Sequence, residues 1–177
     1  MSVLREHFAT LARYHWWATQ RLYVHVDALS LNDYRRDCGL FFASVHGTLN
    51  HLLVADELLW YPRFVESRSP KIALDTEAEP ERAPLRERLL NAAARWQPAV
   101  AAFDDARFAG TLDYRSTKGL SQSLPFAATL AHVFNHGTHH RGQITSALTA
   151  MGQTCPEIDL VWMLQAESRP AQGLRPS

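Results

Sequence analysis

Histidine is the residue type through which this sequence could do chemistry. The chain has 9 histidines among its 177 residues, and four of them fall between His132 and His140. Side chains four residues apart project from one helix face about 40° apart, so two imidazoles at that spacing can bind one metal ion. Two pairs have this spacing, His132 with His136 and His136 with His140. The cluster therefore predicts a metal site on a helix, with two alternative ligand pairs.

The apolar residues of this predicted helix distinguish the two pairs. On a helical wheel they share one direction, which must face the core: Phe126, Leu130, Val133, Ile144, Leu148 and Met151. His140 lies about 50° from this direction and His136 about 90°, whereas His132 and His139 lie about 130° or more away. We therefore expect His136 and His140 to be the inner pair, and His139 to be solvated.

A metal held by two histidines needs further ligands, which a helical bundle supplies from a facing helix. The second predicted helix offers His46 and His51, each beside an apolar stripe, so periodicity alone does not choose between them. Asp56 and Glu57 follow His51 by about one to two turns and are the carboxylates nearest the predicted site. They are candidates for a general base, although a solvated helix face explains them more simply.

The elements that must position these residues can be predicted from apolar periodicity and capping signals. Apolar residues recur at helical spacing over residues 3–29, 40–65, 85–103 and 125–151. Ser123 as an N-cap and Pro125 in the first turn predict where the fourth helix begins, and Gly152 predicts where it ends. Pro98 predicts a kink within the third helix. The expected fold class is all-α.

The segments between the helices have different compositions. Residues 66–84 are rich in Ser, Pro, Glu and Asp and read as a long exposed connection. Residues 110–124 alternate weakly around Lys118-Gly119, which indicates a short hairpin or an irregular crossover. The apolar segment 156–163 is expected to pack back on the helices. We expect one domain over residues 1–165 and a disordered tail over 166–177.

Composition excludes several classes of function. The formal net charge is zero, so there is no basic surface to neutralise phosphates, and we expect neither nucleic-acid nor membrane binding. Cys38 and Cys155 are far apart and form no CxxC motif, which argues against a redox pair or a thiolate zinc site. The N-terminus lacks the pattern of a signal peptide, and no apolar run approaches the ~20 residues of a membrane span. We expect a cytoplasmic protein.

At this point the residues show a resemblance to a known family. The sequence Asn-His-Gly-Thr-His-His-Arg-Gly-Gln at residues 135–143 resembles the signature of the DinB family, within the DinB/YfiT-like superfamily. The resemblance extends to Tyr14, Trp17 and Ala18, to residues 44–53 and to the segment that begins at Ile158, so it spans nearly the whole chain.

The resemblance implies a four-helix bundle of up-down-down-up type, usually a homodimer, with three histidines that hold nickel or zinc at one end. Carried over to this chain, the ligands are His51, His136 and His140, and His46 becomes a neighbour of the site. Arg141 and Gln143 belong to the same signature, and their position beside a ligand indicates helix packing or hydrogen bonding to a ligand.

Three neutral ligands would leave one or more positions on the ion open, which is the arrangement of catalytic sites. We therefore expect an enzyme that depends on one divalent metal ion, nickel or zinc. The superfamily resemblance implies either thiol-dependent transfer, with a low-molecular-weight thiol as a small-molecule substrate, or hydrolysis. The alternative is a non-catalytic, metal-binding dimer associated with damage or stress, in which the ion organises the core.

Overall fold

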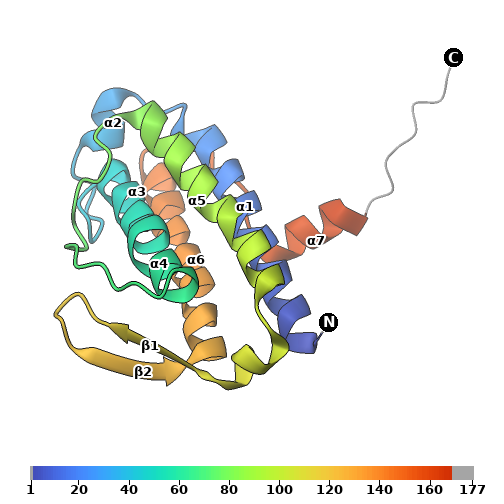
Figure 1. Cartoon of the computed structure of the whole chain (residues 1–177). Helices are drawn as coiled ribbons and strands as arrows, with labels where there is room; N and C mark the ends of the chain where they lie inside the picture. The colour runs from blue at the N-terminus through green and yellow to red at the C-terminus, as the bar shows by residue number, and fades with distance from the viewer. Residues whose placement is uncertain (1, 169–177) are drawn as a thin grey trace, which may run out of the picture.

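The computed structural model describes residues 2–168, and four long helical segments dominate it (Figure 1). They are α1 (Val3–Val26), a composite segment made of α3 (Val45–Leu53), the π-helix η1 (Val54–Trp60) and α4 (Tyr61–Val65), then α5 (Arg82–Ala102) and α6 (Phe126–Ala150). Helices α1 and α3 each contact both α5 and α6. Among the described residues, no helix combines the length and apolar character that a membrane span requires.

Helix α1 follows from its cap and its apolar stripe. The Ser2 side chain accepts a hydrogen bond from the Arg5 backbone N–H, which satisfies one of the unpaired donors of the first turn. Phe8, Ala12 and Leu22 recur at helical spacing and are all buried. The prediction of a helix here is confirmed, with its end at Val26.

The second predicted helix begins later than expected, at Val45 rather than at residue 40. Leu40 and Ala43 form an isolated β-bridge, and Ala43 has a φ of 62°, a left-handed conformation that a helix cannot contain. The Ser44 side chain then caps α3 by accepting a hydrogen bond of 2.9 Å from the Gly47 N–H. Local turn chemistry therefore outweighs apolar periodicity in this stretch.

The composite segment changes its helical winding after Leu53. In the π-helix η1 the hydrogen bonds run from residue i to i+5, so the rotation per residue differs from that of an α-helix. A wheel drawn with 3.6 residues per turn therefore misplaces the side chains of Val54–Trp60. Such π-helical turns are frequent at functional sites.

The long connection 66–81 contains neither helix nor strand, as its composition predicts. Helix α5 begins at Arg82, three residues before the predicted start, and runs through Pro98 without interruption. Before the long connection, the short helix α2 (Leu31–Arg35) is capped by the Ser30 side chain, which accepts a hydrogen bond from the Asp33 N–H.

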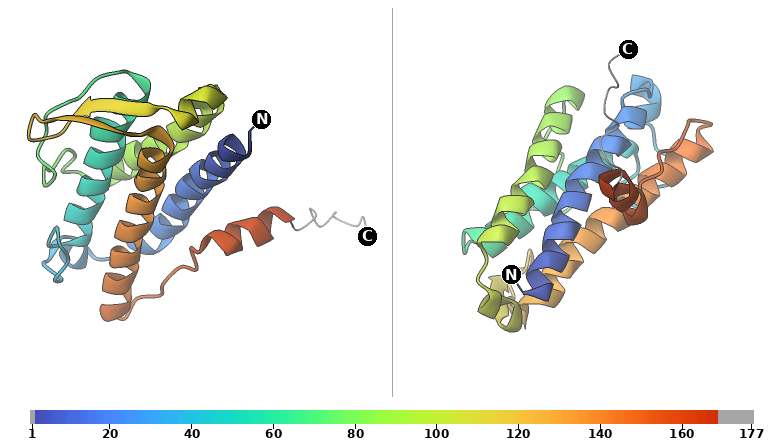
Figure 2. Two further views of the ribbon diagram at one scale, coloured as in Figure 1. Left: turned by 90° about the horizontal axis from the view of Figure 1, so that it is seen from below. Right: turned by 90° about the vertical axis from the view of Figure 1, so that its right-hand side faces the viewer.

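Residues 110–124 form a hairpin rather than a crossover. Strands β1 (Thr111–Arg115) and β2 (Ser121–Pro125) pair antiparallel, and Gly119 provides the positive φ of 82° in the turn. The chain is therefore mostly helical with a small two-stranded sheet, so the prediction of an all-α fold is wrong in this respect. Figure 2 shows the hairpin lying across the ends of α4 and α6 that it contacts.

The start of α6 also differs from the prediction. Ser123 is not an N-cap, because it pairs with Asp113 inside β2. Pro125 occupies the N-cap position and no side chain caps the helix. At the other end, the helix stops at Ala150 and Gly152 has a φ of 73°, which confirms the predicted closure.

The segment after α6 returns to α1, as predicted. The last described helix, α7 (Leu160–Ser168), packs beside α1 (Figure 2). Earlier in the chain, a short 3-10 helix, η2 (Asp105–Ala109), connects α5 to the hairpin. Met163 of α7 is buried against Tyr14 and Ala18. Helix α7 continues three residues into the predicted disordered tail 166–177, and the rest of that tail lies outside the described residues.

The core consists of two apolar clusters with polar residues between them. One cluster contains Leu22, Leu53 and Ile144, and the other contains Ala12, Phe64 and Phe134. Several buried polar residues of α1, the composite segment and α6 lie beside or between these two sets: His15, His51, Asp56, His140 and Arg141. This polar layer contains the candidate site.

Candidate metal centre

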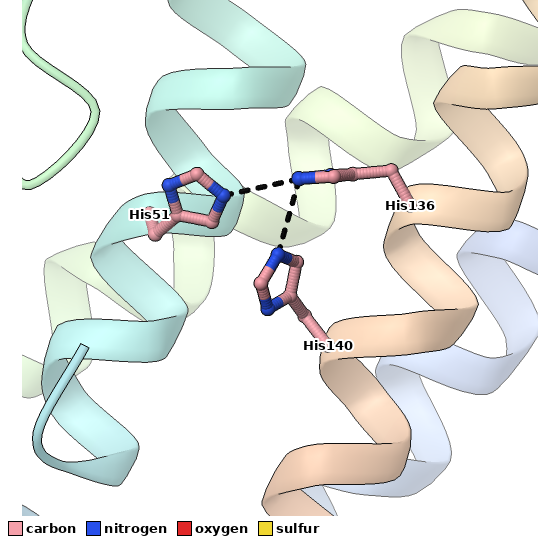
Figure 3. A group of neighbouring side chains, drawn as sticks. All are labelled: His51, His136 and His140. Atoms are coloured by element: carbon pink, nitrogen blue, oxygen red, sulfur yellow. Dashed lines mark hydrogen bonds between the residues drawn. The ribbon is translucent and has the colours of Figure 1, made fainter. Parts of the chain in front are cut away.

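Three histidines from two facing helices converge in the polar layer (Figure 3). The Nε2 atoms of His51 and His136 are 3.0 Å apart, and those of His136 and His140 are 3.1 Å apart. One ligand atom from each of the three residues lies within 4.8 Å of the others. The structure therefore brings His51, on α3, to the pair that the helical period predicts on α6.

The outer nitrogens of two rings are held by hydrogen bonds that fix the tautomer. His51 Nδ1 lies 2.8 Å from the backbone oxygen of Leu74, and a carbonyl oxygen can only accept, so Nδ1 carries the proton. His140 Nδ1 lies 2.7 Å from Oε1 of Gln143 and donates in the same way. Both rings therefore direct the unprotonated lone pair of Nε2 toward His136.

The spacing of the three nitrogens suits a divalent metal. Zinc–nitrogen bonds of about 2.0–2.1 Å in tetrahedral geometry place two ligand atoms about 3.3 Å apart, close to the 3.0 and 3.1 Å observed. Two of the converging nitrogens, Nε2 of His51 and of His140, carry a lone pair and no proton. A cation placed between them would stabilise this arrangement. These three residues could therefore hold a metal ion.

The electrostatics of the cluster keep the rings neutral. Burial, reinforced by the neighbouring His140 and His51, lowers the pKa of His136 to about 3. Burial also lowers the pKa of His140 to about 4 and lowers that of His51. Since metal ligands must be deprotonated, the folded protein presents all three imidazoles in the binding form at neutral pH.

We predict that the metal-free protein loses stability as the pH falls from about 6.5 toward about 4. In this window the unfolded chain protonates histidines whose ordinary pKa is 6.5, whereas folded His136 and His140 stay neutral to about 3 and 4. Each such histidine lowers the free energy of unfolding by about 1.4 kcal/mol per pH unit. Urea denaturation at a series of pH values measures the slope.

The matched control for this pH dependence is an exposed histidine of the same helix. His136→Ala should flatten the slope, whereas His139→Ala should leave it unchanged, because His139 is exposed. Equal slopes in both variants would show that the buried histidines do not cause the loss of stability.

The other histidines of the two helices lie outside the cluster. His46 Nε2 is 2.6 Å from a carboxylate oxygen of Glu77, and its ring packs on Tyr34. His139 is exposed, as predicted. His132 is also exposed, yet its ring lies 5.3 Å from that of Trp60 and 5.6 Å from that of His136.

Asp56 belongs to a buried hydrogen-bond network rather than to a solvated helix face. Its carboxylate lies 2.6 Å from His15 Nε2 and 2.8 Å from Trp96 Nε1, and the residue is only 5% exposed. Burial alone would raise the pKa of Asp56, but the contacts with His15, Trp96 and Arg141 outweigh it and lower this pKa. With both carboxylate oxygens engaged, Asp56 is not free to serve as the general base for which it was a candidate. Glu57 forms an ion pair with Arg88 instead.

His15 connects Asp56 to Arg141 of α6. A guanidinium can only donate, so Nη1 of Arg141 donates to His15 Nδ1 over 3.0 Å, and the ring proton sits on Nε2, facing Asp56. Nη2 of Arg141 donates to Thr138 Oγ1 over 3.1 Å. The network thus ties the turn of α6 that carries His136 and His140 to α1 and η1.

Sequence reasoning missed His15, although a signal was present. His15 occupies a position on the apolar stripe of α1, between Ala12 and Leu22, and is 3% exposed. Its ring packs so closely on α6 that a methyl group at Gly137 would come within 2.6 Å of His15 Cε1. A histidine on a core stripe needs buried hydrogen-bond partners, which Asp56 and Arg141 provide.

A cavity of about 340 Å³ adjoins the histidine cluster at two of its three residues. His51 and His136 contribute to its wall, with Trp60 and Arg63 of the composite segment and Tyr114 of the hairpin. The Phe42 ring stacks on His51 with ring centres 3.8 Å apart. The cluster is therefore packed against an aromatic ring and is open to a space of ligand size.

The fold and the cluster define a class: mostly helical proteins in which two facing helices bring three histidines together in an arrangement that could hold a metal ion. Over residues 1–173 the chain matches the model of the DinB family, and it belongs to that family. No match is found among curated proteins or among solved structures.

Proposed function

We propose that this protein is a divalent-metal-dependent enzyme whose ligands are His51, His136 and His140, with nickel or zinc as the metal. The observation that carries the proposal is the convergence of three neutral Nε2 atoms beside a cavity of about 340 Å³. Within residues 2–168 the cluster contains no carboxylate or thiolate that would close the site. Three protein ligands with an open position are typical of catalytic centres.

The residues around the cluster have distinct tasks in this proposal. A divalent ion supplies Lewis acidity, which can lower the pKa of a thiol or water or polarise a carbonyl. Leu74 and Gln143 fix the orientation of His51 and His140 through the hydrogen bonds to Nδ1. His132 lines the cavity outside the cluster and is placed to accept a proton from a substrate.

We propose a thiol-dependent transferase or a hydrolase, and paired assays distinguish the two. Zinc- and nickel-loaded protein is assayed with glutathione plus chlorodinitrobenzene, and with nitrophenyl acetate. We expect turnover in one assay to exceed that of the chelator-stripped protein by at least about tenfold, because the ion activates the thiol or water. His136→Ala serves as a control for metal dependence. Turnover that does not change on stripping would contradict the proposal.

The alternative is a non-catalytic, metal-binding dimer. It draws support from the position of the cluster, because an ion held by His51 and the α6 pair would join α3 to α6 within the core. Metal-dependent stability without turnover on either substrate, with a dimer mass by light scattering, would favour this alternative.

We also propose a finer fold assignment, an up-down-down-up four-helix bundle. The contacts of α1 and α3 with both α5 and α6 support it.

A further inference from the structure

Arg63 is a buried cation that contacts two aromatic rings, which also contact each other. It lies on α4 and is 5% exposed. Its guanidinium carbon is 4.7 Å from the ring centre of Trp60 and 4.6 Å from that of Tyr114 on the hairpin. Contact with aromatic faces stabilises a guanidinium but leaves its N–H edge free to bind an acceptor.

The described residues provide few hydrogen-bond acceptors for the donors of Arg63. Nη2 donates one long hydrogen bond of 3.4 Å to the backbone oxygen of Arg115, and the buried Nε has no partner within the described residues. None of the ion pairs found over residues 2–168 contains Arg63, and burial lowers the pKa of this residue. A buried charge without a counter-ion is unfavourable, so this position is incomplete without an anion.

The same cavity connects Arg63 to the histidine cluster. Its wall includes Arg63, His51 and His136, together with Ser116 and Thr117 from the hairpin turn. The volume of about 340 Å³ is at the small end of the range for ligand pockets. A single small molecule can therefore contact the metal position with one end and Arg63 with the other.

We infer that this cavity binds a small molecule with a carboxylate group, which Arg63 holds while a second donor atom of the same molecule reaches the histidine cluster. The inference rests on the proposed metal site for the second contact only. One guanidinium balances one negative charge, and its planar fork matches the two oxygens of a carboxylate. The hydroxyls of Ser116 and Thr117 line the same space and can donate further hydrogen bonds.

Two thiols of equal chain length test the inference. Mercaptohexanoate and mercaptohexanol differ only in the group that would reach Arg63. Their dissociation constants are measured by calorimetry on the zinc-loaded protein, and we expect mercaptohexanoate to bind at least about tenfold more tightly, the effect of a charge-assisted hydrogen bond. Arg63→Met should remove this preference without weakening mercaptohexanol.

Arg95→Met is the matched control, since Arg95 also lies over an aromatic ring, that of Tyr61, but belongs to a different part of the surface. Arg63→Lys, which keeps the charge but not the planar fork, should retain part of the preference for mercaptohexanoate. It also covers the case in which the methionine variant does not fold.

If wild type binds the two thiols equally, Arg63 is not the anion site while the open metal site stands. If mercaptohexanol does not bind but mercaptohexanoate binds in an Arg63-dependent way, the metal proposal fails and the Arg63 site stands. Binding of neither probe overturns the inference.

Discussion

Replacing any one of His51, His136 and His140 with alanine is expected to reduce the metal content of the purified protein from near one equivalent to a small fraction. Loss of a residue that only hydrogen-bonds to a ligand already weakens metal binding by about 10–100-fold, so loss of a ligand should exceed about 100-fold. The Nε2 atoms of the three residues converge, and no described carboxylate could substitute for the missing imidazole. Elemental analysis in chelator-free buffer measures the content.

Histidines that flank the cluster provide the controls for this experiment. His46→Ala removes a ring engaged with Glu77, and His132→Ala removes one that lies beside His136 without joining the cluster. Both variants should keep the metal. A wild-type protein that contains no metal and takes up none would rule out the ligand assignment, and the three rings would then be packing residues.

The second large effect is expected for Asp56→Ala, which should lower the free energy of unfolding by about 3–5 kcal/mol. The substitution leaves His15 Nε2 and Trp96 Nε1 without their acceptor and removes the negative charge that offsets Arg141, which is only 1% exposed. Urea denaturation of the metal-free protein, followed by circular dichroism, measures the loss. Metal-free protein is used so that a change in metal affinity does not add to the result.

The adjacent carboxylate is a matched control for Asp56. Glu57 forms an ion pair with Arg88 at the surface, at 3.2 Å and with side chains 26% and 32% exposed, so Glu57→Ala should cost about 1 kcal/mol or less. Asp56→Asn retains the shape of the side chain and one acceptor oxygen. Its loss in free energy of unfolding should lie between those of Asp56→Ala and Glu57→Ala. Equal losses for Asp56→Ala and Glu57→Ala would mean that the buried network does not stabilise the fold.

The fold was predictable where the determining interactions are local. The apolar stripe and cap of α1 and the glycine that ends α6 depend on residues within a few positions of one another. The predictions that were wrong concern boundaries where two local signals compete. Serine is a favoured N-cap residue, but Ser123 pairs with Asp113 in the hairpin, and β2 extends to Pro125. Ser123 therefore lies inside the strand and cannot cap α6.

The sequence by itself determined the pair His136 and His140, because the four-residue spacing and the apolar direction of α6 are properties of one helix. It could not choose between His46 and His51 by periodicity, since both border apolar stripes. Packing of α3 against α6 decides this point: it brings His51 to His136 and leaves His46 beside Glu77.

Only the tertiary structure decided the surroundings of the cluster. The π-helical winding of η1 turns Asp56 into the core, where His15 and Arg141 arrive from two other helices. Arg63 meets Tyr114 only because the hairpin folds across α4. These contacts join residues more than 40 positions apart in the sequence, so no local pattern encodes them, and a helical wheel fails where the winding departs from 3.6 residues per turn.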